Sequence, residues 1–463
     1  AFNPRLVGAW ISLAAALSTT ALCRLLGSGA RVSWAAGIAM LLVPTWMEFG
    51  ASAYVEPYLV LLSTLALCAG VRAVEGEDSA GLPLALLLGL AAGVKYPGLA
   101  VLGFVLLGVL IVQLMKAKES DGDISLLMAQ WLPLAATAAV LAAPFYMRNL
   151  LERGNPIFPL AFDSLGGEGW DTTRAWMYAE TLRAYGEGRG LLDYLLLPVR
   201  LFTSTDLRTG FQGSIGPLPL IFVGFGLWRL RTHGDARHRL VGGFGVIWAL
   251  FWALNVQQTR FFLVGLSPLL ALGIWGVSHR PLREQRIGLA LAWIGMVVWS
   301  IRPLDQVWRP QQTGAWLTGE ISEDEIMDGV MPWTWRVYGD LESYVPEDGK
   351  IWLVHTRAHT YYLRRDYRLD CVFEEWRLVE SLVDGPDSAR FEDELRAEGF
   401  THLLINHAFF LTTVDDETRS VLEARFASML EQGLLVREAS WQIIEGEVGE
   451  QVPMVLYRVE LDA

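Results

Sequence analysis

Cysteine is scarce in this sequence of 463 residues, which contains only three. Cys23 and Cys68 lie inside apolar runs, and Cys371 is the single cysteine of the charged C-terminal part, so that part can form no internal disulfide. The same part contains four histidines, namely His355, His359, His402 and His407. Their spacing does not match the cysteine and histidine spacing of known zinc sites. We therefore predict neither a metal site nor a cofactor.

Long apolar runs are missing after Pro303, whereas runs of about 20 residues follow one another before it. A helix of that length crosses the hydrocarbon core of a membrane, and 52% of the residues are hydrophobic. The part after Pro303 carries about −18 of the formal charge and the part before it about +5. The acidic part is not typical of a nucleic-acid-binding protein. We predict an α-helical polytopic membrane domain over 1–303 and a soluble domain over 304–463.

Ten apolar segments of the membrane domain are predicted to be helices. They lie near 6–26, 32–48, 53–73, 82–94, 98–115, 128–147, 217–230, 240–256, 261–278 and 286–301. The loops 229–239 and 280–286 are the richest in arginine, and short loops of this kind stay in the cytoplasm. Counting from them places the long loop 149–216, the stretch around Lys95 and residues 304–463 outside the cytoplasmic (inner) membrane.

One lysine, Lys95, interrupts the apolar stretch GLAAGVKYPGLAVL. A cation at the centre of a membrane helix costs about 2.5–3.5 kcal/mol, so we expect an anionic partner. The apolar segments on its two sides would form one helix of about 34 residues, roughly 50 Å long, against a hydrocarbon core of about 30 Å. A turn at Pro97 is therefore predicted, and this turn brings Lys95 to an outer helix end.

The predicted topology brings three cations to outer helix ends, namely Lys95, Arg148 and Arg260. Arginine offers a bidentate fork and lysine a point charge, and together they suit the phosphate or diphosphate head group of a lipid. Alternatively, each side chain extends separately to the membrane interface, as cations at helix ends commonly do.

Two acids, Glu48 and Glu56, border an outer loop in the stretch WMEFGASAYVEPYLV. A carboxylate beside a donor phosphate could accept the proton of an attacking hydroxyl group, so both are candidate general bases. For Glu56 a structural role is equally open, because an acid followed by Pro57 is typical of a helix N-terminus.

Short elements are predicted outside the membrane. Aromatic residues and leucines recur through the polar loop 149–216, which favours amphipathic helices on the membrane surface or packing against the soluble domain. In the soluble domain, KIWLVHT and THLLINH have the pattern of buried strands, and FEDELRAEG and ETRSVLEARFASMLEQG that of helices. This alternation predicts a small α/β layer.

Three stretches, GLAAGVKYPGLAVL, PFYMRNLLERGNPIFP and QQTRFFLVGLSPLLAL, resemble landmarks of the bacterial GT-C glycosyltransferases. That group contains the protein O-mannosyltransferases and the lipid A aminoarabinose transferase. The resemblance covers most of residues 1–302, and many members carry an external α/β domain as well. It implies a membrane enzyme that takes a sugar from a polyprenyl-phosphate donor, with Lys95, Arg148 and Arg260 near the donor phosphate.

The resemblance also implies a catalytic Asp or Glu in the first external loop, between the first two helices. By the predicted topology Ala1 lies outside, directly before a membrane segment, so we expect at least one helix and that loop to precede it. Glu48 and Glu56 belong to the next external loop and are the candidates within this sequence.

The leading hypothesis is an enzyme, surrounded by membrane lipids, that transfers the sugar with inversion of configuration. The acceptor would be an extracytoplasmic glycan, lipid or protein. One alternative is a catalytically inactive GT-C-like subunit of a membrane complex. A third hypothesis, a transporter, is disfavoured because no paired inverted halves or matching broken segments recur in the sequence.

Overall fold

The computed structural model describes residues 4–50, 54–119, 124–308, 312–331, 334–356, 360–370, 376–383, 389–410, 414–445 and 450–461. The chain divides into two compact units. The membrane unit comprises Ala1–Ala161 and Ala179–Val307, and the sheet unit comprises Phe162–Tyr178 and Trp308–Ala463. The sheet unit thus takes in a segment of the long loop that the sequence analysis placed with the membrane domain.

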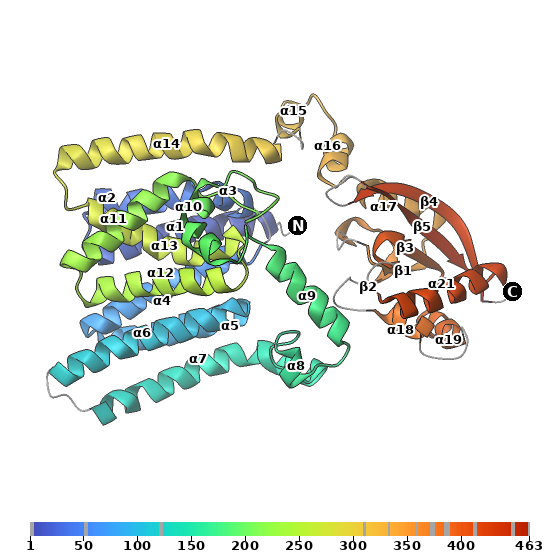
Figure 1. The fold of residues 1–463 in the computed structure, drawn as a ribbon, viewed down its shortest axis with the longest axis horizontal. Coiled ribbons are helices and arrows are strands. Elements are labelled where there is room, and N and C mark those ends of the chain that lie inside the picture. The colour runs from blue at the N-terminus through green and yellow to red at the C-terminus, as the bar shows by residue number, and fades with distance from the viewer. Residues whose placement is uncertain are drawn as a thin grey trace. The chain divides into compact units, whose positions relative to one another are not determined.

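The membrane unit is built from helices, most of which run roughly side by side (Figure 1). In chain order they are α1 (Pro4–Leu25), α2 (Ala30–Leu41), α3 (Pro44–Gly50), α4 (Glu56–Glu75), η1 (Asp78–Ala80), α5 (Gly81–Val94), α6 (Pro97–Glu119), α7 (Ile124–Arg153), α10 (Leu191–Thr203), α11 (Pro217–His233), α12 (Ala236–Leu254), α13 (Thr259–Val277) and α14 (Leu282–Trp308). Helix α13 is buried along nearly its whole length. It therefore forms the centre of the unit's apolar core.

The predicted membrane segments correspond to helices, with one correction. The segment 32–48 is two helices, α2 and α3, bent by 72°. Pro44 explains the break, because proline lacks the amide hydrogen of a helix interior and disfavours helical geometry at Val43. Among the described residues, six helices are long and apolar enough to cross a membrane, or seven if the bent pair is one span. Helices α5, α11 and α12 match predicted segments but are not among those six.

The turn predicted at Pro97 is confirmed. Helix α5 ends at Val94 and α6 begins at Pro97, so Lys95 and Tyr96 connect two separate helices. Gly98 is required here, because a Cβ at this position would overlap the carbonyl oxygen of Ala91. Because the chain turns this tightly between α5 and α6, the backbone position of Lys95 is fixed.

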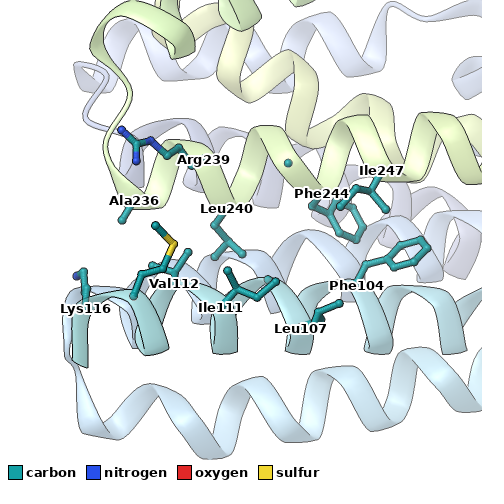
Figure 2. A pocket seen from close by; sticks show the side chains of 13 residues that line it. Phe104, Leu107, Ile111, Val112, Lys116, Ala236, Arg239, Leu240, Phe244 and Ile247 are labelled. Carbon is teal, nitrogen blue, oxygen red and sulfur yellow. The ribbon is translucent and has the colours of Figure 1, made fainter. Parts of the chain in front are cut away.

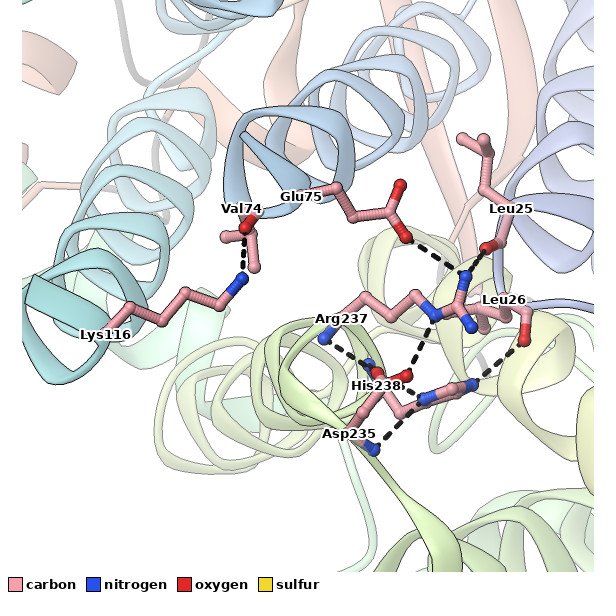
Figure 3. Close-up of polar contacts among 8 residues, drawn as sticks. All are labelled: Leu25, Leu26, Val74, Glu75, Lys116, Asp235, Arg237 and His238. Carbon is pink, nitrogen blue, oxygen red and sulfur yellow. Dashed lines mark hydrogen bonds and ion pairs between the residues drawn. The ribbon is translucent and has the colours of Figure 1, made fainter. Parts of the chain in front are cut away.

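The loops that are predicted to face the cytoplasm contact one another at one end of the membrane unit. Figure 3 shows these contacts. Arg237, at the start of α12, donates to the Leu25 carbonyl oxygen at 3.0 Å and pairs with Glu75 at 3.0 Å. His238 Nε2 lies 2.9 Å from the Leu26 carbonyl oxygen. The ends of α1 and α4 and the start of α12 are thereby held together, which agrees with the predicted alternation of the helices.

The predicted orientation can be tested with reporters. A reporter that is active only outside the cytoplasm, fused after residue 463, should be active, because the arginine-rich loops of the membrane unit are predicted to remain inside. The same fusion with a reporter that is active only in the cytoplasm should be silent. The reverse pair of results would contradict an external position for residues 304–463.

The sheet unit contains a five-stranded sheet in the order β2-β1-β3-β5-β4. Its strands are β1 (Lys350–Val354), β2 (Asp366–Asp370), β3 (His402–Asn406), β4 (Leu435–Glu445) and β5 (Glu450–Val459). Strand β1 pairs in parallel with β2 and β3, whereas β5 is antiparallel to β3 and β4. Strands β1 and β3 are the two that the sequence predicts. Helices lie between β2 and β3 and between β3 and β4 in chain order, so the expected α/β class is confirmed.

The helices of the sheet unit include two that the sequence predicts, α19 and α21. In chain order they are α8 (Phe162–Leu165), α9 (Thr172–Ala184, which continues into the membrane unit), α15 (Thr313–Leu317), α16 (Glu323–Val330), α17 (Thr334–Tyr344), η2 (Thr360–Tyr362), α18 (Arg377–Val383), α19 (Ala389–Glu398), α20 (His407–Phe410) and α21 (Asp416–Glu431). Arg174 of α9 is buried, pairs with Glu380 at 2.8 Å and lies over the Trp376 ring. This arginine explains why residues 162–178 belong to the sheet unit.

Candidate anion-binding site

Three charged residues from distant parts of the sequence meet at the end of the membrane unit away from Arg237. Glu56 is the first residue of α4, Lys95 lies between α5 and α6, and Arg260 is in the first turn of α13. Lys95 Nζ lies 2.8 Å from Glu56 Oε1, and Arg260 Nε lies 3.7 Å from the same oxygen. The structure thus gives Lys95 a protein partner, and it brings Lys95 and Arg260 together around that partner.

The charges of this group do not cancel. One carboxylate faces two cations, which leaves a formal charge of +1 on these three residues. Glu48 also lies near Arg260, but Arg208 near Glu48 offsets its charge, so the formal charge of the five residues is +1 as well. The Glu56 side chain is 1% exposed, whereas Lys95 is 33% and Arg260 22% exposed. The other Glu56 oxygen, Oε2, has no hydrogen-bond partner among the residues that the structure describes. The cations therefore keep part of their surface open to an anion, while the carboxylate that holds them is buried.

Aromatic rings surround the two cations. Lys95 Nζ lies 4.3 Å from the centre of the Phe261 ring, and Arg260 lies 4.9 Å from the same ring. Arg260 also lies 5.2 Å from Tyr54 and 5.7 Å from Phe49. Cation–π contacts of this kind keep both cations in place without adding negative charge. The sequence analysis missed these rings, although Phe261 directly follows Arg260 and Phe49 directly follows Glu48.

The start of α13 is fixed by hydrogen bonds that position Arg260. Arg260 Nη2 donates to Gln258 Oε1 at 3.0 Å, and Gln258 Nε2 donates to Gln212 Oε1 at 2.8 Å. Trp252 and Trp248 of α12 donate their indole N–H groups to the carbonyl oxygens of Gln258 at 2.7 Å and Phe261 at 2.9 Å. Because these groups are mostly buried, the bonds hold Arg260 in one orientation.

Helix α3, which carries Glu48, is tied to the same region. The Thr45 hydroxyl donates to the Ser214 carbonyl oxygen at 2.8 Å and accepts from the Ser214 amide at 2.7 Å. Gly213 leaves room for this contact, because a Cβ there would come within 2.6 Å of the Thr45 hydroxyl oxygen. Glu48 itself is partly buried, and Arg208 and Arg260 are the cations whose charges act on it. Glu48 and Glu56 thus share Arg260 as a neighbouring cation.

Arg148, the third predicted cation, occupies a different environment. Its side chain is 73% exposed and pairs with Glu152 one helical turn later, at 3.1 Å. Its neighbour Asn149 contacts the Lys95 turn, because Asn149 Nδ2 donates to the Tyr96 hydroxyl at 2.9 Å. That hydroxyl in turn donates to the Phe158 carbonyl oxygen. The C-terminal end of α7 therefore lies against the turn, while Arg148 itself is not in contact with Lys95, Glu56 or Arg260.

The described histidines of the sheet unit do not form a metal site. Burial lowers the pKa of His355 to about 4, and burial together with Arg437 lowers the pKa of His407 to about 4, so both rings are neutral at pH 7. His359 and Cys371 lie outside the described residues. Within the described parts of the chain, no three side chains of His, Cys, Asp or Glu are placed to share a metal ion.

Comparison with known proteins identifies the fold. No protein-family model and no curated protein sequence matches the chain. ArnT from Cupriavidus metallidurans has a similar structure in the apo state, with 15% identity, a TM-score of 0.56, and coverage of 98% of this chain and 83% of ArnT. ArnT bound to undecaprenyl phosphate gives the same coverage and TM-score at 14% identity. The archaeal oligosaccharyltransferase AglB from Archaeoglobus fulgidus, with an inhibitory peptide and dolichol phosphate, gives 11% identity and a TM-score of 0.46 over 97% of this chain and 62% of AglB.

The similarity to ArnT, a GT-C glycosyltransferase, shows that the chain has a GT-C-like fold. The fold that the sequence resemblance implied is confirmed, and the chain is a multi-pass membrane protein with a C-terminal α/β unit. At 14–15% identity the comparison establishes the fold and not the activity.

Proposed function

We propose that this protein is a glycosyltransferase of the cytoplasmic (inner) membrane. It takes a sugar from a polyprenyl-phosphate donor and transfers it to an extracytoplasmic glycan, lipid or protein acceptor. The observation that carries the proposal is the residual positive charge of Lys95, Arg260 and Glu56 at one end of the membrane unit. A structure with the same fold, ArnT, has been determined with undecaprenyl phosphate bound, and this also supports a lipid phosphate as the anion.

The two cations would bind the donor phosphate and stabilise it as the leaving group. In the proposed step, the acceptor hydroxyl oxygen forms a bond to the anomeric carbon of the sugar, with inversion at that carbon. The bond between this carbon and the phosphate oxygen breaks, and polyprenyl phosphate leaves with the electron pair. Lys95 and Arg260 then face the charge that develops on that oxygen.

The two acids take different parts in the proposal. Glu56 is buried and in contact with both cations, so we assign it a positioning role: it holds Lys95 and Arg260 side by side. Glu48 is only partly buried, and we propose that it accepts the proton of the acceptor hydroxyl group. Arg148 stays a prediction as a third phosphate ligand, which would require it to leave Glu152.

Binding of undecaprenyl phosphate to the purified full-length protein tests the site. Lys95→Gln and Arg260→Gln should each weaken binding about tenfold or more, because a charge-assisted hydrogen bond contributes about 1.5–3 kcal/mol. Arg148→Gln should weaken it less, because the exposed pair with Glu152 already occupies that side chain. Arg24→Gln, at the opposite end of the membrane unit, is the matched control and should bind normally.

Two results would count against the proposal. Unchanged affinity in both Lys95→Gln and Arg260→Gln would show that these cations do not bind the donor phosphate. Normal donor binding without sugar transfer to any acceptor, in a protein that melts normally, would favour the inactive subunit of a membrane complex instead.

A further inference from the structure

A groove lies between α6 and α12 (Figure 2), and none of the residues that line it belongs to the candidate anion-binding site. Its cavity volume is about 350 Å³. The walls are apolar, formed by Leu107, Ile111 and Met115 of α6 and by Leu240, Phe244 and Ile247 of α12. Gly108 allows the Leu240 side chain to pack closely against α6, whereas a Cβ at Gly243 would meet no other atom within 4 Å. The groove is therefore wide enough at Gly243 to admit a hydrocarbon chain.

Two cations lie at one end of this groove, Lys116 from α6 and Arg239 from α12, as Figure 2 shows. Roughly 28 Å of helix, at about 1.5 Å per residue, separates Lys116 from Pro97 at the other end of α6. This is close to the thickness of the hydrocarbon core, about 30 Å. The cationic end of the groove thus lies at the membrane interface opposite Lys95.

The side chains of Lys116 and Arg239 differ in their hydrogen bonds within the protein. Lys116 donates to the Val74 carbonyl oxygen at the end of α4, so its charge is held close to the groove (Figure 3). The Arg239 side chain is exposed and makes no hydrogen bond or ion pair within the described part of the chain. Arg237, two residues earlier, instead contacts Glu75, Asp235 and the Leu25 carbonyl oxygen. Arg239 is the cation that remains available to a ligand.

We propose that this groove binds one anionic glycerophospholipid, with an acyl chain along the apolar walls and the phosphate between Lys116 and Arg239. The charge of the two side chains selects an anionic head group, and basic pockets between membrane helices are known to bind such lipids. The apolar walls beside the two cations favour a lipid over a free phosphate as the ligand. This site is separate from the donor site and does not depend on the proposed transferase activity.

The test is lipid binding by the purified full-length protein in mixed micelles, with phosphatidylglycerol as the probe and phosphatidylcholine as the reference. Phosphatidylglycerol should bind about 25-fold more tightly. Its head group has a net negative charge, whereas the choline of phosphatidylcholine neutralises the phosphate, and each cation near an anionic head group contributes a factor of about five. Arg239→Gln should reduce this preference about fivefold. It should leave the melting temperature unchanged, since the Arg239 side chain is exposed and makes no hydrogen bond or ion pair with the described residues.

A second variant tests the groove itself. Gly243→Leu should abolish phosphatidylglycerol binding, because the added side chain fills the groove where a Cβ has open space. Gly288→Leu is the matched control, since Gly288 is also a helical glycine with no atom near an added Cβ but lies in α14. Arg283→Gln controls for the loss of charge, because Arg283 is an exposed cation like Arg239 but lies in α14. Both controls should bind phosphatidylglycerol normally, and Gly243→Leu should still bind undecaprenyl phosphate.

Three results would overturn the proposal: equal affinities for phosphatidylglycerol and phosphatidylcholine, normal phosphatidylglycerol binding by Gly243→Leu, or displacement of phosphatidylglycerol from the groove by undecaprenyl phosphate. The last result would make the groove a second polyprenyl-phosphate site. Lys95→Gln separates the two proposals, because it should weaken undecaprenyl phosphate binding and leave phosphatidylglycerol binding unchanged.

Discussion

Glu56→Gln should lower the free energy of unfolding by about 3 kcal/mol, because it leaves Lys95 and Arg260 side by side without the carboxylate between them. Losing one partner of a buried ion pair costs about 3–5 kcal/mol. We expect the lower end of that range, because the two cations are partly exposed to solvent at 33% and 22%. Glutamine keeps the shape of the side chain, so the loss would reflect charge and not packing.

Glu56→Gln should also increase the stabilisation that the protein gains when it binds a lipid phosphate. Without Glu56 the formal charge of the group rises from +1 to +2, so undecaprenyl phosphate should raise the melting temperature of Glu56→Gln more than that of the unaltered protein. Glu152→Gln is the matched control, since Glu152 pairs with Arg148 on the exposed surface and its loss should cost under about 1 kcal/mol. Equal melting temperatures for Glu56→Gln and Glu152→Gln would refute the positioning role of Glu56.

The helices of the membrane unit could be predicted from the sequence because their signal is local. Apolar runs of membrane length and the proline at position 97 mark where helices begin and end. The break between α2 and α3 had a local signal too, Pro44, but the surrounding apolar run hid it. Hydropathy alone measures length and polarity, so it does not report a bend of 72° within an apolar run.

Packing of the loop 149–216 against the soluble domain was one of two alternatives from the sequence, but the sequence could not single out residues 162–178 as the part that belongs to the sheet unit. This membership depends on Arg174, whose partner Glu380 lies 206 positions away in the sequence. Arginine and glutamate are common throughout this chain, and nothing near either residue marks the pair. Long-range pairing of charges follows from the fold and leaves no periodic pattern.

In the candidate site, too, the charged residues could be selected from the sequence, but their pairing could not. The three residues were selected for different reasons. Lys95 interrupts an apolar stretch, where a charge is costly and calls for a partner. Arg260 lies at a predicted outer helix end, and Glu56 borders an outer loop as a candidate general base. The sequence analysis took a lipid phosphate as the partner of Lys95, whereas the structure places Glu56 there. The predicted topology put all three residues at one end of the membrane domain, but it contained no distances between helix ends. Only the packing of α4 and α13 against the Lys95 turn decides which charges meet.

Glu48→Gln should reduce the rate of sugar transfer by about 10²–10⁴-fold, the usual contribution of a general base. The amide has the same shape as the carboxylate but cannot take the proton of the acceptor hydroxyl group. Donor binding should remain within about threefold of normal, because Lys95 and Arg260 keep their contacts with Glu56 in this variant. The measurement is transfer from a polyprenyl-phosphate-linked sugar by the protein in liposomes, with undecaprenyl phosphate binding measured in parallel.

Comparison with Glu56→Gln separates catalysis from positioning. Glu56 touches the cations, so its loss should alter donor affinity and stability together, whereas the loss of Glu48 should alter the rate alone. Glu48→Asp is the second variant, because it keeps the basic group but draws it back by one methylene, and it should retain more activity than Glu48→Gln. Full transfer activity in Glu48→Gln would exclude Glu48 as the base and leave the cationic site with a donor-binding role only.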